Sequence, residues 1–211
     1  MSKKITVNPA YILETGTLDG PVDFASLFGR AGKVQIEIGS GKGTFLVHQA
    51  AAFGDVNFVG IEWSAEYFRL AADRIARHNL SNVRMIRTDA AVFLRRHVSD
   101  AVIEMFHVYF PDPWPKRRHH KRRFFNRDNL EQMLRCLEPG GLINFATDHA
   151  DYYEQVQELA RWAGEEGRAE CVPFVRPAGA REGEWTGTNY ERKYLKEGRA
   201  IYTLTLRKLI P

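Results

Sequence analysis

The chain has 211 residues, a length typical of one domain, and its 44% hydrophobic content suits a protein with a buried core. No apolar run approaches the roughly 20 residues of a membrane span, and the N-terminus lacks the apolar stretch of a secretory signal. The net charge of +4 is too small by itself to indicate a nucleic-acid partner. Cys136 and Cys171 lie far apart, without metal-ligand spacing, and indicate free thiols in a reducing cytoplasm.

Residues 1–32 are turn-rich and are expected to form an irregular N-terminal arm or cap. From residue 33 onward, strand and helix patterns alternate, which predicts one α/β domain over 33–211 with a mostly parallel sheet and helices on both faces. The predicted strands are 34–39, 57–63, 83–89, 101–110, 142–148 and 200–208, the last one antiparallel. The predicted helices are 43–53, 64–80, 90–98, 126–141 and 150–167.

Glycines follow the first predicted strand in "EIGSGKGTF", at Gly39, Gly41 and Gly43. They allow tight turns and close approach of a ligand to the backbone. The spacing excludes a P-loop, since Lys42 is followed by glycine, and it excludes the dinucleotide fingerprint, since the third glycine comes too soon. The alternative is a glycine-rich turn that binds nothing.

Acidic residues end the next two strands. Glu62 follows the glycines by about twenty residues, where a carboxylate can accept both hydroxyls of a ribose. Asp89, beside the Ala90 amide, can accept from an adenine amino group, and Glu37 places a carboxylate near a cationic or amino group. Each acid alone could be a solvated strand end. Because the carboxyl ends of parallel strands meet at one edge of a sheet, together they predict a nucleoside-shaped crevice.

The fourth strand ends in "VYFPDPWPKRRHHKRRFF", where three prolines make a stiff loop around Asp112 and Trp114. Trp114 could stack on a base or buttress the loop. Six of the 30 Lys and Arg residues then fall within 116–123. Such a basic run is ordinarily interpreted as a solvated face of the protein. Here the run directly follows the strand end that carries Asp112, which favours binding of nucleic-acid phosphates, with a base presented to Asp112. His119 and His120 fit a polar surface better than a metal site.

The layout over 34–208 resembles the S-adenosylmethionine-dependent methyltransferases, whose Rossmann-like sheet has about seven strands. Within them, "PDPWPKRRHHKRRF", "ATDH" at 146–149 and "TNYERKYLKEG" at 188–198 are similar to motifs of the bacterial tRNA (guanine-N7-)-methyltransferases. The resemblance implies a cytoplasmic enzyme that binds tRNA but no membrane. It also implies S-adenosylmethionine as methyl donor, S-adenosylhomocysteine as product, no metal, and a guanosine of the variable loop as acceptor. It leaves open whether the enzyme is a monomer or a homodimer.

The resemblance also assigns roles to residues, with Asp112 as the catalytic residue. The implied cofactor contacts are Glu37, Gly39, Gly41, Glu62, Trp63, Asp89, Ala90 and Asp112. The implied substrate contacts are Lys116, Asp148, Thr188, Asn189, Tyr190 and Glu191, and the implied RNA-backbone contacts are Arg117, Arg118, Lys121, Arg122 and Arg123. No general base is expected, because guanine N7 already carries a lone pair and no proton.

Two other functions stay open from the residues alone. One is a small-molecule methyltransferase whose basic loop lies on the surface and has no role in substrate binding. The other is a non-catalytic RNA-binding protein that keeps a relict nucleoside pocket. The acids at four strand ends favour an enzyme, since a binding module has no need of them all.

Overall fold

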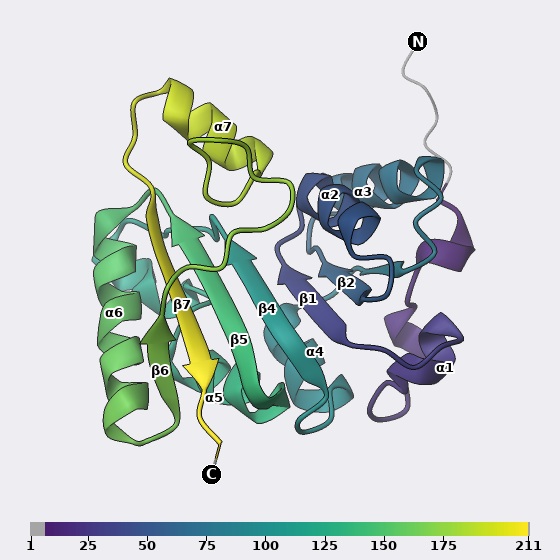
Figure 1. Cartoon of the computed structure of the whole chain (residues 1–211), viewed down its shortest axis with the longest axis horizontal. Coiled ribbons are helices and arrows are strands. Elements are labelled where there is room, and N and C mark those ends of the chain that lie inside the picture. Colours follow the sequence, from purple (N-terminus) through teal and green to yellow (C-terminus); the bar gives the residue numbers. More distant parts are fainter. Residues whose placement is uncertain (1–6, 211) are drawn as a thin grey trace. The chain divides into compact units, whose positions relative to one another are not determined.

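The computed structural model describes residues 7–210, which group into two compact units, one ending at Ser99 and one beginning at Asp100 (Figure 1). The first unit contains η1 (Pro9–Tyr11), η2 (Thr15–Thr17), α1 (Phe24–Phe28), β1 (Val34–Ile38), α2 (Thr44–Ala52), β2 (Asn57–Ile61), α3 (Ala65–Arg77), β3 (Val83–Ile86) and α4 (Ala90–His97). The second contains β4 (Ile103–Tyr109), η3 (Arg117–Arg122), α5 (Arg127–Cys136), β5 (Leu137–Thr147), α6 (Ala150–Glu165), β6 (Ala169–Val172), α7 (Asn189–Lys196) and β7 (Tyr202–Lys208).

In the first unit, three short parallel strands lie in the order β3-β2-β1. All residues of β1 and β2 are buried, including the polar or charged Gln35, Glu37 and Asn57, as expected of parallel strands covered on both faces. Two of the helices begin at side-chain caps: Ser64 accepts the Tyr67 amide at the start of α3, and Asp89 accepts the Val92 amide at the start of α4. The caps fix each helix start directly after a strand end.

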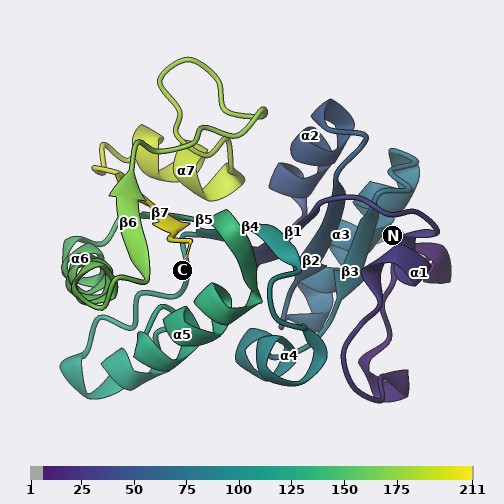
Figure 2. The same cartoon turned by 60° about the horizontal axis from the view of Figure 1, so that its bottom comes forward.

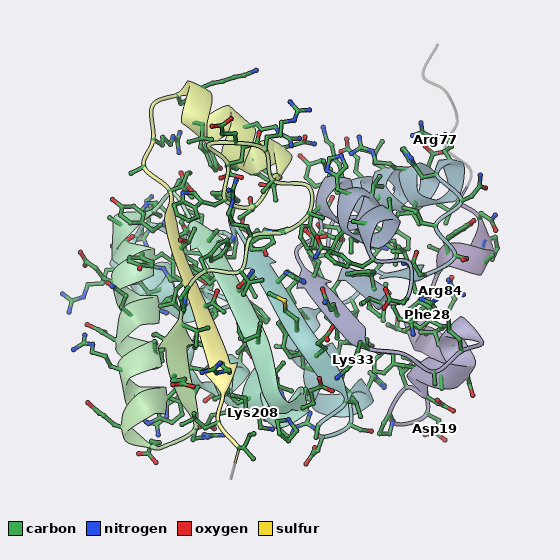
Figure 3. All side chains as sticks on the ribbon, viewed as in Figure 1. Asp19, Phe28, Lys33, Arg77, Arg84 and Lys208 are labelled. Carbon is green, nitrogen blue, oxygen red and sulfur yellow. The ribbon has the colours of Figure 1, made fainter. Side chains whose placement is uncertain are left out.

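The described part of the predicted N-terminal arm packs against β3. The Leu13 amide donates to the Met85 carbonyl at 2.9 Å, and Leu13 and Phe24 are both buried. Figure 3 shows Arg84 beside Phe28, and its guanidinium lies 5.0 Å from the centre of that ring. Residues 1–6 of the arm lie outside the described residues, and the domain boundary at 32/33 stays a prediction.

In the second unit, the strand order is β4-β5-β7-β6. β4 and β5 are parallel, whereas β7 runs antiparallel to both β5 and β6. Figure 2 shows α5 and α6 on the same face of these strands, and Figure 1 shows α7 beyond the carboxyl ends of β4 and β5. The core includes a line of edge-to-face aromatic contacts from Phe125 through Phe145 to Tyr152.

A buried polar network crosses the strands of the second unit. His107 Nδ1 lies 2.9 Å from the Tyr109 hydroxyl, and burial lowers the pKa of His107 to about 3, so its imidazole is neutral. The Asn144 amide donates to the Tyr109 hydroxyl at 3.1 Å and to the Val175 carbonyl at 2.6 Å. Thr205 in turn donates to Asn144 Oδ1 at 2.5 Å. The network therefore holds the segment after β6 against β5 and β7.

The predicted α/β class, its parallel strands and its antiparallel last strand are confirmed. The helix predicted over 126–141 ends at Cys136, because the residue before Pro139 is biased away from helix and Leu137 is already paired with Ile103. The elements that were not predicted include the short helices η1, η2, α1 and η3, the strand β6, which has four residues of which two are charged or polar, and α7.

Candidate active-site residues

The chain turns sharply after β1, and the turn is fastened to the end of β2. The amides of Gly39 and Ser40 both donate to the Ile61 carbonyl, at 2.9 and 3.0 Å. Gly39 has φ of +77°, a left-handed conformation that glycine adopts without strain, and a Cβ placed there would meet nothing within 4 Å. The turn thus leaves open space in which a ligand can approach the backbone closely.

Glu62, the acid after β2, holds this turn with both of its carboxylate oxygens. Oε2 accepts the Gly41 amide and Oε1 accepts the Ser64 amide, each at 2.7 Å, and the residue is only 9% exposed. A carboxylate has about four lone-pair positions, so each oxygen can accept a further donor. Glu62 can therefore organise the glycine turn and still bind a pair of hydroxyls.

Glu37 lies in β1 as a buried acid with incomplete hydrogen bonding. Its Oε2 atom has no hydrogen-bond partner among the described residues. Burial, and secondly the charge of Glu62, raise the pKa of Glu37 well above its ordinary value. An unpaired buried acceptor costs about 1–3 kcal/mol. A hydroxyl or ammonium donor that reached Oε2 would remove this cost.

Trp63, Asp89 and Ala90 occupy the neighbouring strand ends. The Trp63 side chain is 71% exposed and presents a broad apolar surface beside Glu62. Asp89 is exposed, and its Oδ1 accepts the Val92 amide at 3.0 Å, which leaves capacity for a further donor next to the Ala90 amide. The Glu62 amide donates to the Ile86 carbonyl at 3.1 Å, so the ends of β2 and β3 lie side by side.

Within the first unit, the structure therefore brings the predicted cofactor residues to one edge of three parallel strands. Glu37, Gly41 and Glu62 form one group, linked by the hydrogen bond and the charge interaction described above. Trp63 adjoins them in sequence, and Asp89 with Ala90 follows the next strand. The meeting of these strand ends is confirmed for this unit, while their contacts with a ligand stay predictions.

Asp112 lies in the loop after β4, between two residues with left-handed backbone. Phe110 has φ of +50° and Trp114 has φ of +42°. Such conformations cost about 1–3 kcal/mol each in non-glycine residues and persist only where the surroundings hold them. Asp112 itself is exposed, and no hydrogen bond from residues 7–210 reaches its carboxylate. The loop is rigid and its acid is available to a ligand.

The basic run forms the 3-10 helix η3 and surrounds Trp114. The exposed members are Lys116, Arg117, Arg118, Lys121 and Arg122. The Arg122 guanidinium lies 5.0 Å from the Trp114 ring centre, and His119 meets the ring edge-on at 5.9 Å. In this arrangement Trp114 buttresses the loop, which is one of its two predicted roles.

Arg123 does not belong to this exposed surface, so its burial does not support the predicted contact with the RNA backbone. Its side chain is 1% exposed. The guanidinium donates to the Pro113 carbonyl at 2.8 Å, to Gln155 Oε1 at 3.0 Å and to Asp151 Oδ2 at 2.6 Å, and it lies 4.7 Å from the centre of the Tyr152 ring. The guanidinium is thus buried and uses its donors within the protein, so its charge is not presented at the surface with the other cations of the run.

Asp148 follows β5 and is paired with an arginine that the sequence did not single out. Arg199 Nη1 lies 2.7 Å from Asp148 Oδ2, and the same guanidinium stacks 4.6 Å from the centre of the Tyr194 ring. Burial, and next the charge of Asp148, raise the pKa of Tyr194. The ion pair leaves Asp148 Oδ1 as the acceptor for any substrate. The sequence contains no signal for it, because the partners are 51 residues apart.

Thr188 and Glu191 hold the segment before α7 and do not offer free groups to a substrate. The Thr188 hydroxyl accepts the Glu191 amide at 3.1 Å, as a helix N-cap. Glu191 is fully buried, and its carboxylate accepts the amides of Trp185, Thr186 and Gly187 at 2.5 to 2.8 Å, together with the Thr186 hydroxyl. The predicted direct contact of Glu191 with substrate stays a prediction, and within the described residues its carboxylate organises the turn before α7.

Asn189 and Tyr190 remain exposed on the first turn of α7. The Tyr190 ring lies 6.3 Å from the Tyr194 ring, which in turn lies 5.5 Å from Phe110 in the Asp112 loop. Tyr194 thus connects α7 to the end of β4. It was not predicted, although its i+4 spacing from Tyr190 is typical of two neighbours on one helix face.

Metal sites and membrane spans are two further classes of feature to consider in the described residues. Between residues 7 and 210, no three His, Cys, Asp or Glu side chains come together in a group that could hold a metal ion. No helix within the same range combines the length and the apolar character needed to cross a membrane.

Comparison with known proteins identifies the relatives of this chain. A family model described as "Putative methyltransferase" matches residues 31–204. The tRNA (guanine-N(7)-)-methyltransferase of Ruegeria pomeroyi is 38% identical over 191 residues, which is 90% of this chain and 78% of that protein. The protein of the same name from Geobacter metallireducens is 33% identical over 208 residues, 99% of this chain and 97% of its own length.

Solved structures show the same fold at low sequence identity. The 16S rRNA methyltransferase KamB superposes with a TM-score of 0.63 at 16% identity, over 92% of this chain and 96% of its own. The aminoglycoside resistance methyltransferase NpmB1 gives 0.58 at 15% identity, over 89% and 92%. The extent of the family match and the identity to full-length relatives lead to one conclusion. The chain belongs to the tRNA (guanine-N7-)-methyltransferase family of S-adenosylmethionine-dependent enzymes.

Proposed function

We propose that this chain transfers the methyl group of S-adenosylmethionine to N7 of a guanosine in the variable loop of tRNA and releases S-adenosylhomocysteine. Membership of the family, and relatives with that name along nearly the whole chain, support the activity. The observation that carries it is the loop after β4, where an available carboxylate, Asp112, leads directly into an exposed basic helix. A tRNA substrate places the enzyme in the cytoplasm.

The reaction needs alignment more than acid-base chemistry. When bound, S-adenosylmethionine supplies a methyl group on a positively charged sulfur. The N7 lone pair forms the new N–C bond, the C–S bonding electrons return to sulfur, and the purine becomes a cation. No proton leaves N7, so no general base is required. Alignment of two bound reactants can supply about 7–11 kcal/mol.

The first unit offers a cofactor site of matching chemistry. Glu62 would accept the two ribose hydroxyls, and Asp89 with the Ala90 amide would meet the adenine edge. The exposed Trp63 ring would cover an apolar surface of the nucleoside. The unpaired Glu37 Oε2, buried in β1, would accept from the methionine ammonium. Open space at Gly39 supports a close approach of the cofactor to the turn.

The second unit offers acceptors and cations for the RNA. Asp112 and the free Oδ1 of Asp148 would accept from the N1 and N2 hydrogens of guanine, and their charge would favour the cationic product. Lys116 would meet guanine O6 or a nearby phosphate, and the exposed Asn189 and Tyr190 would contact the nucleotide. The RNA backbone would bind the exposed cations Arg117, Arg118, Lys121 and Arg122.

The test is incubation with methyl-labelled S-adenosylmethionine and unmodified tRNA, followed by digestion and nucleoside analysis. Label in 7-methylguanosine is expected. A matched transcript whose variable-loop guanosine is replaced by adenosine should accept no label. Label in another nucleoside, or no transfer to tRNA by a protein that binds the cofactor, would overturn the proposal.

A further inference from the structure

Arg123, the last residue of the basic run 116–123, has a different structural role from the other Lys and Arg residues of that run. Its five exposed Lys and Arg residues present charge to solvent, whereas Arg123 is buried and makes three hydrogen bonds to the protein. Its Nε atom donates to the carbonyl of Pro113, the residue after Asp112. Arg123 is thus connected to the backbone that carries Asp112.

The other two bonds of Arg123 end on α6. Asp151 and Gln155 accept from the two terminal nitrogens, and Tyr152 lies against the face of the guanidinium. Asp151 is in the first turn of α6, three residues after Asp148. A single side chain therefore connects the Asp112 loop to the helix that directly follows Asp148.

The same helix also holds the far end of the loop. The Phe125 amide donates to the Tyr152 hydroxyl at 2.8 Å, and the Gln155 amide donates to the Phe125 carbonyl at 2.8 Å. The segment 110–125 is consequently fastened to α6 at Pro113 through Arg123 and at Phe125 directly. Asn126 and α5 follow at once.

The loop needs such external bonds because its own backbone supplies few. Pro111, Pro113 and Pro115 have no N–H to donate. Phe110 and Trp114 have positive φ, which persists only where surrounding contacts determine the conformation. Between residues 7 and 210, two hydrogen bonds reach the backbone of 110–115: the Phe110 amide donates to the Ala146 carbonyl at 2.7 Å, and Arg123 donates to the Pro113 carbonyl at 2.8 Å.

We propose that Arg123 is a positioning residue that holds Asp112 in the geometry required for methyl transfer, by fastening the Pro113 carbonyl to Asp151 and Gln155. This inference rests on the proposed function of Asp112. Lysine cannot replace the arginine, since a single ammonium lacks the planar fork that reaches all three acceptors at once. Charge is retained in Arg123→Lys, so this variant separates positioning from phosphate binding.

The first measurement is hydrogen–deuterium exchange of the free protein. In Arg123→Lys, amides within 110–126 should exchange at least tenfold faster, and amides within 34–64 should be unchanged. Arg127→Lys is the matched control: this nearby exposed arginine stacks on Trp162 and should leave the 110–126 segment as in the wild type. Unchanged exchange at 110–126 in Arg123→Lys would overturn the proposal. The exchange measurement does not depend on activity. If the wild type methylated no tRNA, the proposed function would fail, and the exchange result would still test whether Arg123 holds the loop.

The second measurement is single-turnover methyl transfer at saturating tRNA and cofactor. Arg123→Lys should be slower by on the order of 100-fold, because small displacements of a positioned group have effects of that size. Its tRNA affinity and the salt dependence of that affinity should match the wild type. A wild-type rate would overturn the proposal. If Arg123→Lys does not fold, Asp151→Asn is the alternative: it neutralises Asp151, the charged member of the three acceptors, and should show both effects in the same direction, more weakly. Wild-type exchange and a wild-type rate in that variant would likewise count against it.

Discussion

The carboxylate of Glu62 accepts the Gly41 amide at 2.7 Å, so the acid that ends β2 fixes the glycine turn that follows β1. The two residues are 21 positions apart, and the bond is buried. A single side chain therefore shapes the turn and, on the proposed function, also binds the ribose. Loss of Glu62 should affect the cofactor through both routes.

Glu62→Ala should weaken S-adenosylmethionine binding by about 10- to 100-fold, since hydrogen bonds to charged groups contribute roughly 1.5–3 kcal/mol. Isothermal titration calorimetry measures the change directly. Glu66→Ala, which removes an exposed acid from the first turn of α3, is the matched control and should bind normally. Unchanged affinity in Glu62→Ala would remove this residue from the cofactor site.

Glu37→Gln should make the free protein more stable at neutral pH. The pKa of Glu37 is raised by burial and then by the charge of Glu62, so the folded state holds its proton more tightly than the unfolded chain does. Glu37 therefore does not reduce the free energy of unfolding below the ordinary carboxyl pKa, about 4.3. As the pH rises from there toward the raised pKa, the free energy of unfolding falls. The neutral amide has no such loss.

Thermal unfolding between pH 5 and pH 8, without cofactor, tests this expectation. The Tm advantage of Glu37→Gln over the wild type should grow with pH, and the exposed Glu66→Gln should show no trend. Parallel Tm profiles for wild type and Glu37→Gln would mean that Glu37 is not a source of destabilisation. The same variant should bind S-adenosylmethionine more weakly, since it loses the charge that would meet the ammonium.

Gly187→Ala should destabilise the second unit more than Gly183→Ala. Both glycines have positive φ, +68° and +77°, which costs an alanine about 1–2 kcal/mol. At Gly183 a Cβ meets nothing within 4 Å, whereas at Gly187 it would lie 2.4 Å from the Gly179 carbonyl oxygen. Denaturant unfolding of the two variants isolates the clash. Equal losses of unfolding free energy would show that the 179–187 segment can move aside.

The sequence predicted the strand ends well because their signals are local. Gly39, Gly41 and Glu62 each lie within three residues of the strand they follow, so the strand and the residues after it can be recognised together. The start of α7 was also readable in principle. Thr188 and Glu191 have the spacing of a helix-capping pair, and the Thr188 hydroxyl does accept the Glu191 amide.

Burial within the basic run could not be predicted. Arg123 and Arg122 are adjacent and chemically identical, yet one is enclosed by α6 and the other faces solvent. The partners that distinguish them, Asp151 and Gln155, lie 28 and 32 residues further along the chain. The Asp148–Arg199 pair has the same origin. Contacts of this range follow from how the helices pack, which residue patterns do not specify.

Replacing Arg118, Lys121 and Arg122 together by alanine should weaken tRNA binding and flatten its salt dependence. Each lost phosphate contact should reduce the slope of log affinity against log salt by about 0.7–0.9. Filter binding from 50 to 300 mM salt gives the slope. The variant Arg118→Lys with Arg122→Lys keeps the charge and should keep the slope. A triple mutant with the wild-type slope would show that this helix is only a solvated face.

Asp112→Asn should lower the rate of methyl transfer with little effect on tRNA binding. The amide keeps the size of the side chain but loses its charge, and it can present a donor where guanine N1 and N2 need an acceptor. Loss of one preorganised group typically lowers the rate by about 100- to 1000-fold. On the proposed function the phosphate contacts lie on η3, so bulk affinity should stay near the wild-type value.

Single-turnover methyl transfer at saturating tRNA and cofactor separates this effect from binding. Asp128→Asn, an exposed acid in the first turn of α5, is the control and should react at the wild-type rate. Because N7 carries no proton, no general base is needed. A plot of the wild-type rate against pH should therefore show no rise near neutral pH that reports the titration of a base. An Asp112→Asn rate within about threefold of wild type would be incompatible with the role of Asp112. In that case the loop after β4 would contribute through its cations alone, and the positioning role of Arg123 would lose its target.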